Sequence, residues 1–256
     1  MKFLSVLQAA LCVAVAPAIN AQNATGVPAI NTQAPFLAAA LSEFFSDTRA
    51  FTAGVELTLP AKDGEAAMKL PFGVAMADGK MRWELNLANV KSAELPPEAI
   101  ASIKGMGLDQ MFFIYLPGKP LTLVFPGMKT FVEMSLPKTE GIQQQAAEKI
   151  GRLEKTEQGR EVIAGQPTVK YAVKIPGDDG TATVWQATNL QNLPIKMAIT
   201  KNQQTYQLQL SNVRLGQPNA AYFTVPAGFA KASDINAVIQ TAAMKSFGDI
   251  AGGLKP

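Results

Sequence analysis

The feature that most constrains the fold of this chain is a run of large apolar residues at every second position. Residues 68–76 place them on one parity, with small or polar residues between them, and residues 81–87 repeat the pattern after the turn-forming pair Asp78-Gly79. Successive side chains of a strand point to opposite faces, so two paired strands with one apolar face are predicted. This predicted apolar floor consists of Met68, Leu70, Phe72, Val74, Met76, Met81, Trp83, Leu85 and Leu87.

Alternation of this kind returns along most of the chain and predicts a mainly β fold. About a dozen strands at roughly ten-residue spacing indicate an antiparallel meander in a sandwich or barrel-like sheet. A twisted sheet of more than about ten strands tends to curl, which places the apolar floor on a concave side. The other predicted strands are 55–59, 108–116, 121–125, 130–136, 168–175, 181–187, 195–200, 205–213 and 222–225.

Helical patterns are few. Residues 36–46 repeat apolar side chains at every fourth position, and this stripe includes Leu37, Leu41 and Phe44. A short helix is predicted to open at Pro96-Pro97 and to end at Gly105, and a closing helix is predicted over 234–247, capped by Ser233. Helices 36–46 and 234–247 are predicted to cover the concave side. If they do not fill it, the remaining space is an apolar pocket.

The N-terminus has the pattern of a cleavable export signal. Lys2 precedes a short apolar run over residues 3–16, and small residues follow. Cleavage is expected after Ala21 or after Ala18; the alternative is a retained anchor or a buried first helix. The predicted organisation is therefore a signal peptide (1–21), a leader (22–34), one domain (35–231) and a C-terminal helix with its tail (232–256). A periplasmic protein is expected, with no transmembrane segment after cleavage.

Residues that carry most enzyme chemistry are missing from the composition. The chain has no histidine, and its single cysteine, Cys12, lies inside the predicted signal. A Ser-His or Cys-His catalytic pair is therefore excluded from the mature chain. We predict no catalytic residue, no metal ligand and no cofactor, hence no enzyme. A formal net charge of +3 without a clustered basic stripe also predicts no nucleic-acid partner.

Two features of the floor allow two interpretations. Seven of the ten methionines lie between Met68 and Met134. Methionine suits surfaces that adapt to varied apolar ligands, yet ordinary core filling is favoured on composition alone. Arg82, beside Trp83, is the polar residue of most interest, although alternation alone favours an outward, solvated position.

Several segments, taken in order, resemble LolA-like periplasmic lipoprotein carriers. They are Gly79–Glu84, Glu161–Gly165, Val184-Trp185, Leu193–Lys196, Thr205–Leu210 through Asn219, and Tyr222–Phe229. Each motif is short, and their order and spacing together carry the resemblance, which spans roughly residues 36–230.

The resemblance implies a half-barrel of about 11–12 antiparallel strands, lidded by helices over an apolar cavity for acyl chains. It also implies that Arg82 matches the strand arginine that holds the lid. The Arg-Pro element of the carriers is absent here, and a helix is added after Ser233, so lipoprotein cargo is not carried over. We expect a non-catalytic binding protein for a lipid or acyl group, held by the floor, Arg82, Leu37, Leu41 and Phe44. The alternative is an envelope interaction or stress-sensor protein whose concavity is filled by its own helices and whose partner is another envelope protein.

Overall fold

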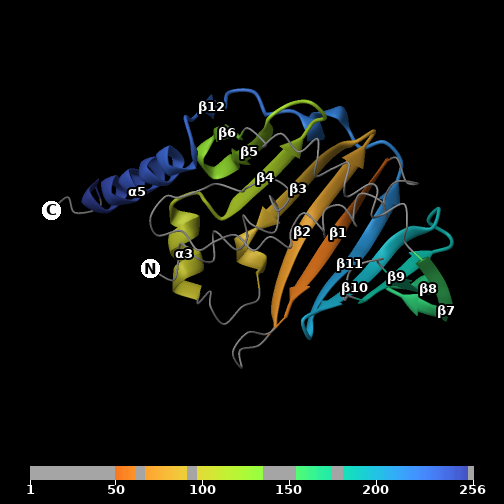
Figure 1. The fold of residues 1–256 in the computed structure, drawn as a ribbon. Coiled ribbons are helices and arrows are strands. Elements are labelled where there is room, and N and C mark those ends of the chain that lie inside the picture. Colours follow the sequence, from red (N-terminus) through yellow and green to blue (C-terminus); the bar gives the residue numbers. More distant parts are fainter. Residues whose placement is uncertain (1–49, 61–66, 91–96, 135–153, 175–180, 253–256) are drawn as a thin grey trace.

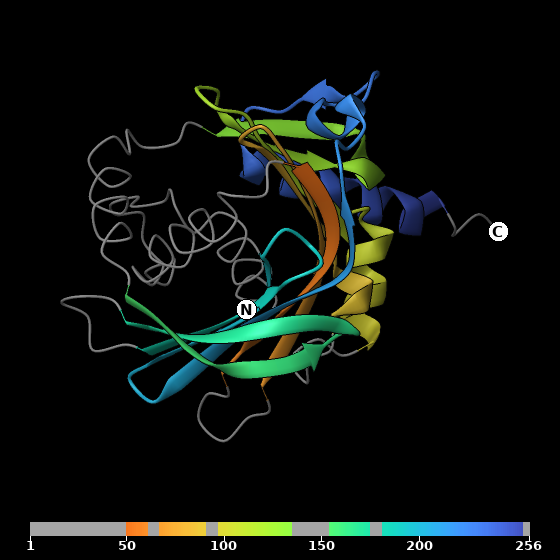
Figure 2. The same cartoon turned by 90° about the vertical axis from the view of Figure 1, so that its right-hand side faces the viewer.

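The computed structural model describes residues 50–60, 67–90, 97–134, 154–174 and 181–252. They form one sheet of twelve strands that does not close into a barrel. Figure 2 shows the sheet bending so that its two ends turn toward the same side. The predicted curled, mainly antiparallel half-barrel is confirmed. Its strands are β1 Ala50–Leu59, β2 Met68–Ala77, β3 Lys80–Asn86, β4 Gln110–Tyr115, β5 Leu121–Phe125, β6 Thr130–Met134, β7 Glu154–Ile163, β8 Gln166–Lys174, β9 Thr181–Ala187, β10 Leu193–Lys201, β11 Gln204–Leu215 and β12 Ala230–Lys231.

The strand order is not the simple meander that the sequence predicts. Strands β1 to β6 run outward in chain order, whereas β7 lies at the far edge and β8 to β11 lead back to β1. The β1–β11 pair therefore joins two meanders in the middle of the sheet (Figure 1). Strand β12 departs from the antiparallel rule, because it pairs in parallel with β6.

The hairpin of β2 and β3 has the predicted register. Met76 pairs with Met81, Val74 with Trp83 and Phe72 with Leu85. Both turn residues have positive φ, 49° for Asp78 and 77° for Gly79. This conformation suits a tight turn between twisted strands, and Asp-Gly is among the pairs that adopt it most readily.

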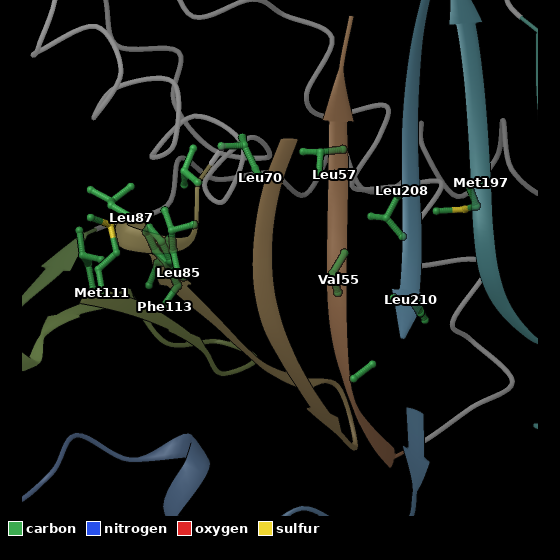
Figure 3. Close-up of a cluster of buried hydrophobic side chains, with 14 of the residues drawn as sticks. Val55, Leu57, Leu70, Leu85, Leu87, Met111, Phe113, Met197, Leu208 and Leu210 are labelled. Carbon is green, nitrogen blue, oxygen red and sulfur yellow. The ribbon is translucent and has the colours of Figure 1, made fainter. Parts of the chain in front are cut away.

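One large cluster of apolar side chains occupies a single face of the sheet. It continues across β2, β1, β11 and β10, where Leu70, Leu57, Leu208 and Met197 follow one another (Figure 3). A smaller cluster around Phe112, Ile114 and Phe223 lies on the opposite face. Figure 2 shows the chain between β11 and β12, which contributes Phe223, on the outer side of the bend. The large cluster therefore lines the concave face.

Helix α3 (Pro97–Gly105) has the predicted bounds, and its Ile103 joins the large cluster. Helix α5 (Ile235–Gly252) contributes Val238 and Ala242 to the same cluster. Figure 1 shows both helices beside the β4–β6 half of the sheet. Neither α3 nor α5, nor any other helix within the described ranges, is long and apolar enough to cross a membrane.

Asp234, not the predicted Ser233, caps helix α5. Asp234 Oδ1 accepts a hydrogen bond of 2.9 Å from the backbone N–H of Ala237, while the Ser233 hydroxyl contacts Asp234 Oδ2 at 3.1 Å. The N–H groups of the first turn have no partner within the helix, so a carboxylate at this position satisfies one of them.

One further prediction is wrong, and one strand was missed. The predicted strand over 222–225 is instead the short helix η3 (Ala220–Phe223), whose first turn is capped by Asn219 Oδ1 accepting from the Ala221 N–H at 2.9 Å. Strand β7 was not predicted, because its sequence is polar at both parities and nearly all its residues are exposed. The predicted helix over 36–46 lies outside the described residues.

Candidate functional site

Six of the nine side chains of the predicted apolar floor remain partly accessible. We name as the hairpin patch the five of them that lie nearest the turn between β2 and β3, namely Phe72, Val74, Met76, Met81 and Trp83. Trp83 continues sideways to Phe113 on β4, which is 0% exposed. On the other side, Met76 pairs with Phe51 on β1, which is also 0% exposed. The hairpin patch is thus a strip of incompletely covered apolar surface between two buried flanks.

The other end of the floor is packed. Leu70, Leu85 and Leu87 are 3%, 8% and 1% exposed. Figure 3 shows Leu85 and Leu87 grouped with Met111 and Phe113 of β4. The floor therefore changes along its length, from a filled core at Leu85 and Leu87 to accessible surface at Met76 and Met81. Met68, at the start of β2, is half-buried and packs against the same cluster.

The predicted lid residues Leu37, Leu41 and Phe44 lie outside the described residues. The structure brings the other apolar side chains of the prediction together on one face. Their chemistry is limited to contact with apolar groups, because none carries a charge. Across the part of the chain that the structure describes, no group of three or more His, Cys, Asp or Glu side chains is placed to hold a metal ion.

Arg82 lies on the opposite face from the hairpin patch. Its register partners are Ala75 on β2 and Ile114 on β4, both members of the smaller cluster. The structure thus separates Arg82 from the apolar residues with which it was predicted to form the binding site. The physical reason is the alternation of the strand itself, since neighbouring side chains cannot share a face.

Arg82 is nevertheless not a solvated surface residue, since its side chain is only 14% exposed. Its Cζ lies 3.6 Å from the centroid of the Phe112 ring and 5.3 Å from that of Tyr222. Nη1 donates a hydrogen bond of 3.1 Å to the backbone oxygen of Tyr222. Nε lies 2.7 Å from Glu84 Oε1, close enough for an ion pair, yet off the N–H axis, so the buried Nε–H has no hydrogen-bond partner. Through its hydrogen bond and ring contact with Tyr222, Arg82 therefore holds η3 against the outer face of β3.

A groove beside Arg82 was not predicted from the sequence. It has a volume of about 240 Å³, and Gly73 and Ala75 line it together with Arg82 and Arg214. The sequence feature that could have predicted the groove is the pair of small residues Gly73 and Ala75, because short side chains leave a depression on that face of β2. Arg82 and Glu84 come from β3, whereas Arg214 comes from β11, whose position beside β1 was not predictable from local pattern.

No family model and no curated protein matches the chain. Solved structures with similar folds include an uncharacterised conserved protein from Thermus thermophilus, at 10% identity and a TM-score of 0.44, covering 77% of this chain and 99% of that one. The MucA/MucB complex of Pseudomonas aeruginosa matches at 12% identity and a TM-score of 0.42, over 75% of this chain and 60% of that one. A LolA superfamily protein from Nitrosomonas europaea matches at 11% identity and a TM-score of 0.34, over 74% and 96%.

Proposed function

We propose that this chain is a periplasmic, non-catalytic binding protein that holds a lipid or acyl group against the concave face of its half-barrel. One observation carries the proposal. The hairpin patch exposes part of five large apolar side chains in the middle of a continuous apolar face, where a completed core would bury them. Apolar surface held in a concave site is the usual lining of a small-molecule pocket.

The chemistry of the hairpin patch matches an acyl chain. It presents only hydrocarbon, thioether and indole surface, and burying each methylene of a ligand contributes about 0.8 kcal/mol. Met76 and Met81 face one another across the strands. Their unbranched side chains can adjust to ligands of different width. The sequence motifs that resemble lipoprotein carriers point to the same class of cargo.

Export supports the same proposal. The pattern from Lys2 to Ala21 is typical of an export signal and predicts a periplasmic mature chain, and a lipid or lipoprotein acyl chain needs a carrier to cross water there. Residues Leu37, Leu41 and Phe44 are proposed to complete the site as its lid. Arg82 is not proposed as a contact of the acyl chain, because it lies on the other face of β3.

A second candidate is an envelope interaction or stress-sensor protein with a filled concavity. The packed end of the floor favours it. Val238 and Ala242 of α5 are 1% and 0% exposed, and Ile103 of α3 is 2% exposed, so the chain's own helices complete the core there. The two candidates differ in what occupies the surface of the hairpin patch.

Substitution of Phe72 separates them. If the hairpin patch is a ligand wall, Phe72→Ala lowers the free energy of unfolding by only about 1–2 kcal/mol, because a half-buried ring loses few contacts. The matched change Phe113→Ala removes a ring that is 0% exposed and costs about 3–5 kcal/mol. We expect the parent protein to bind a fluorescent long-chain fatty acid, and Phe72→Ala to bind it more weakly. Denaturation curves and probe titrations on the same samples measure both quantities.

The opposite pattern would favour the second candidate. It consists of equal, large losses of stability in both variants and no probe binding by the parent protein.

A further inference from the structure

The groove beside Arg82 has a floor of small residues and walls of polar ones. Gly73 and Ala75 of β2 form the floor and pair with Gly54 and Thr52 of β1. On the far side, β11 is irregular where it meets β1, and Asn212 adopts a positive φ of 51°. The walls thus come from β3 and from two consecutive elements, β11 and η3, that are distant from β3 in sequence.

The charges of the groove do not cancel. Glu84 is 2.7 Å from Arg82 and offsets one positive charge. Arg214 is exposed and has no ion pair within the described ranges. The groove therefore keeps about one net positive charge, and the two guanidinium groups on different walls retain N–H donors that no described residue accepts, Nη2 of Arg82 among them.

From these donors and this charge we propose that the groove binds a phosphate group. Arginine is the side chain best suited to oxyanions, since its donors form a planar fork. Side chains that carry donors line the groove from more than one strand, since Thr52, Asn212 and Tyr222 border it together with the two arginines. A tetrahedral phosphate presents acceptor oxygens in several directions, whereas a carboxylate presents them in one plane. The phosphate is either free or the headgroup of a phospholipid. The groove lies beside Arg82 and shares only Val74 with the hairpin patch, so it does not rest on the proposed function.

The test uses the Arg214→Gln variant of the full mature chain, with Arg160→Gln as its matched control. Arg160 lies on the edge strand β7, its side chain is 78% exposed, and its loss changes the net charge equally. Inorganic phosphate is titrated into isotopically labelled protein at constant ionic strength, with backbone amide shifts as the readout. We expect shifts that centre on Gly73, Ala75 and Asn212, and affinity at least about tenfold weaker in Arg214→Gln only.

A second arm identifies the source of the phosphate. Vesicles of phosphatidylglycerol and of phosphatidylcholine are sedimented with parent and variants. Phosphate shifts without vesicle binding support a free phosphate, and vesicle binding that is weakened in Arg214→Gln alone supports a headgroup. The proposal is overturned if neither probe binds, or if both variants weaken binding equally, because general charge attraction would then explain the result.

Discussion

At the scale of single residues, Arg82 shows best what local pattern misses. Alternation correctly predicts that it points away from the apolar floor. It does not predict burial, because the groups that cover the guanidinium, Phe112 and Tyr222, come from a different strand and from a segment 140 residues further along the chain. Whether a charged side chain on a sheet face is solvated or packed depends on which other segments of the chain cover that face, and this is decided by the tertiary structure.

Replacing Arg82 by alanine tests this role. The change removes the stacking on Phe112 and the hydrogen bond to Tyr222, and it uncovers part of the smaller cluster, so we expect a loss of about 2–3 kcal/mol in the free energy of unfolding. Arg82→Lys keeps the charge but lacks the planar guanidinium group, so its free energy of unfolding should lie between those of the parent and Arg82→Ala. Arg160→Ala, at a position that is 78% exposed, is the control and should stay within about 0.5 kcal/mol of the parent. Equal small effects of the alanine changes in chemical denaturation would contradict the role.

At the scale of elements, patterns succeed where one face is apolar and the other is not. The hairpin of β2 and β3 and the short helix α3 are predicted almost to the residue, since alternation and turn chemistry agree there. Strand β7 is missed because an edge strand in water needs no apolar parity. Residues 222–225 have strand-like composition, but Asn219 caps a short helical turn there, and η3 packs on β3 instead of extending the sheet.

The start of helix α5 gives a prediction with a pH dependence. The N–H of Ala237, followed by the Ser233 hydroxyl, holds the pKa of Asp234 below its ordinary value of 3.8. A lowered folded-state pKa means that the carboxylate stabilises the folded chain above its unfolded pKa, and that this contribution disappears as pH falls through the folded value. Asp234→Ala should therefore lower the denaturation midpoint at neutral pH, and its difference from the parent should shrink below pH 3.8.

Two matched variants sharpen that measurement. Asp234→Asn keeps an acceptor oxygen, so its denaturation midpoint at neutral pH should stay close to that of the parent. Because asparagine does not titrate, the part of the pH dependence that comes from Asp234 should be lost. Ser233→Ala removes only a side-chain contact to the carboxylate and should have the smaller effect. If Ser233→Ala proves as damaging as Asp234→Ala, Ser233 is the cap after all.

At the scale of the whole molecule, strand number and curl follow from the sequence, whereas strand order does not. The alternation within each strand predicts that strand alone. No local pattern in β1 or β11 predicts that these two strands, far apart in the chain, pair with each other and join the two meanders (Figure 1). The apolar members of the candidate site were predictable because they share one parity. Their division into a packed end and an accessible end depends on where the helices α3 and α5 dock, which no strand pattern specifies.

Native mass spectrometry of the full-length gene product, recovered from the periplasm without detergent, tests whether the concave face holds an acyl ligand. We predict the mass of a polypeptide whose first residue is Gln22 or Ile19. A second species should be heavier by one lipid or acyl group, and that group should dissociate on collisional activation. The same ligand should be absent from Phe72→Asp, since a charge in an apolar site is costly. A periplasmic protein that carries no such ligand, and that takes up none when offered long-chain fatty acid, would contradict the account.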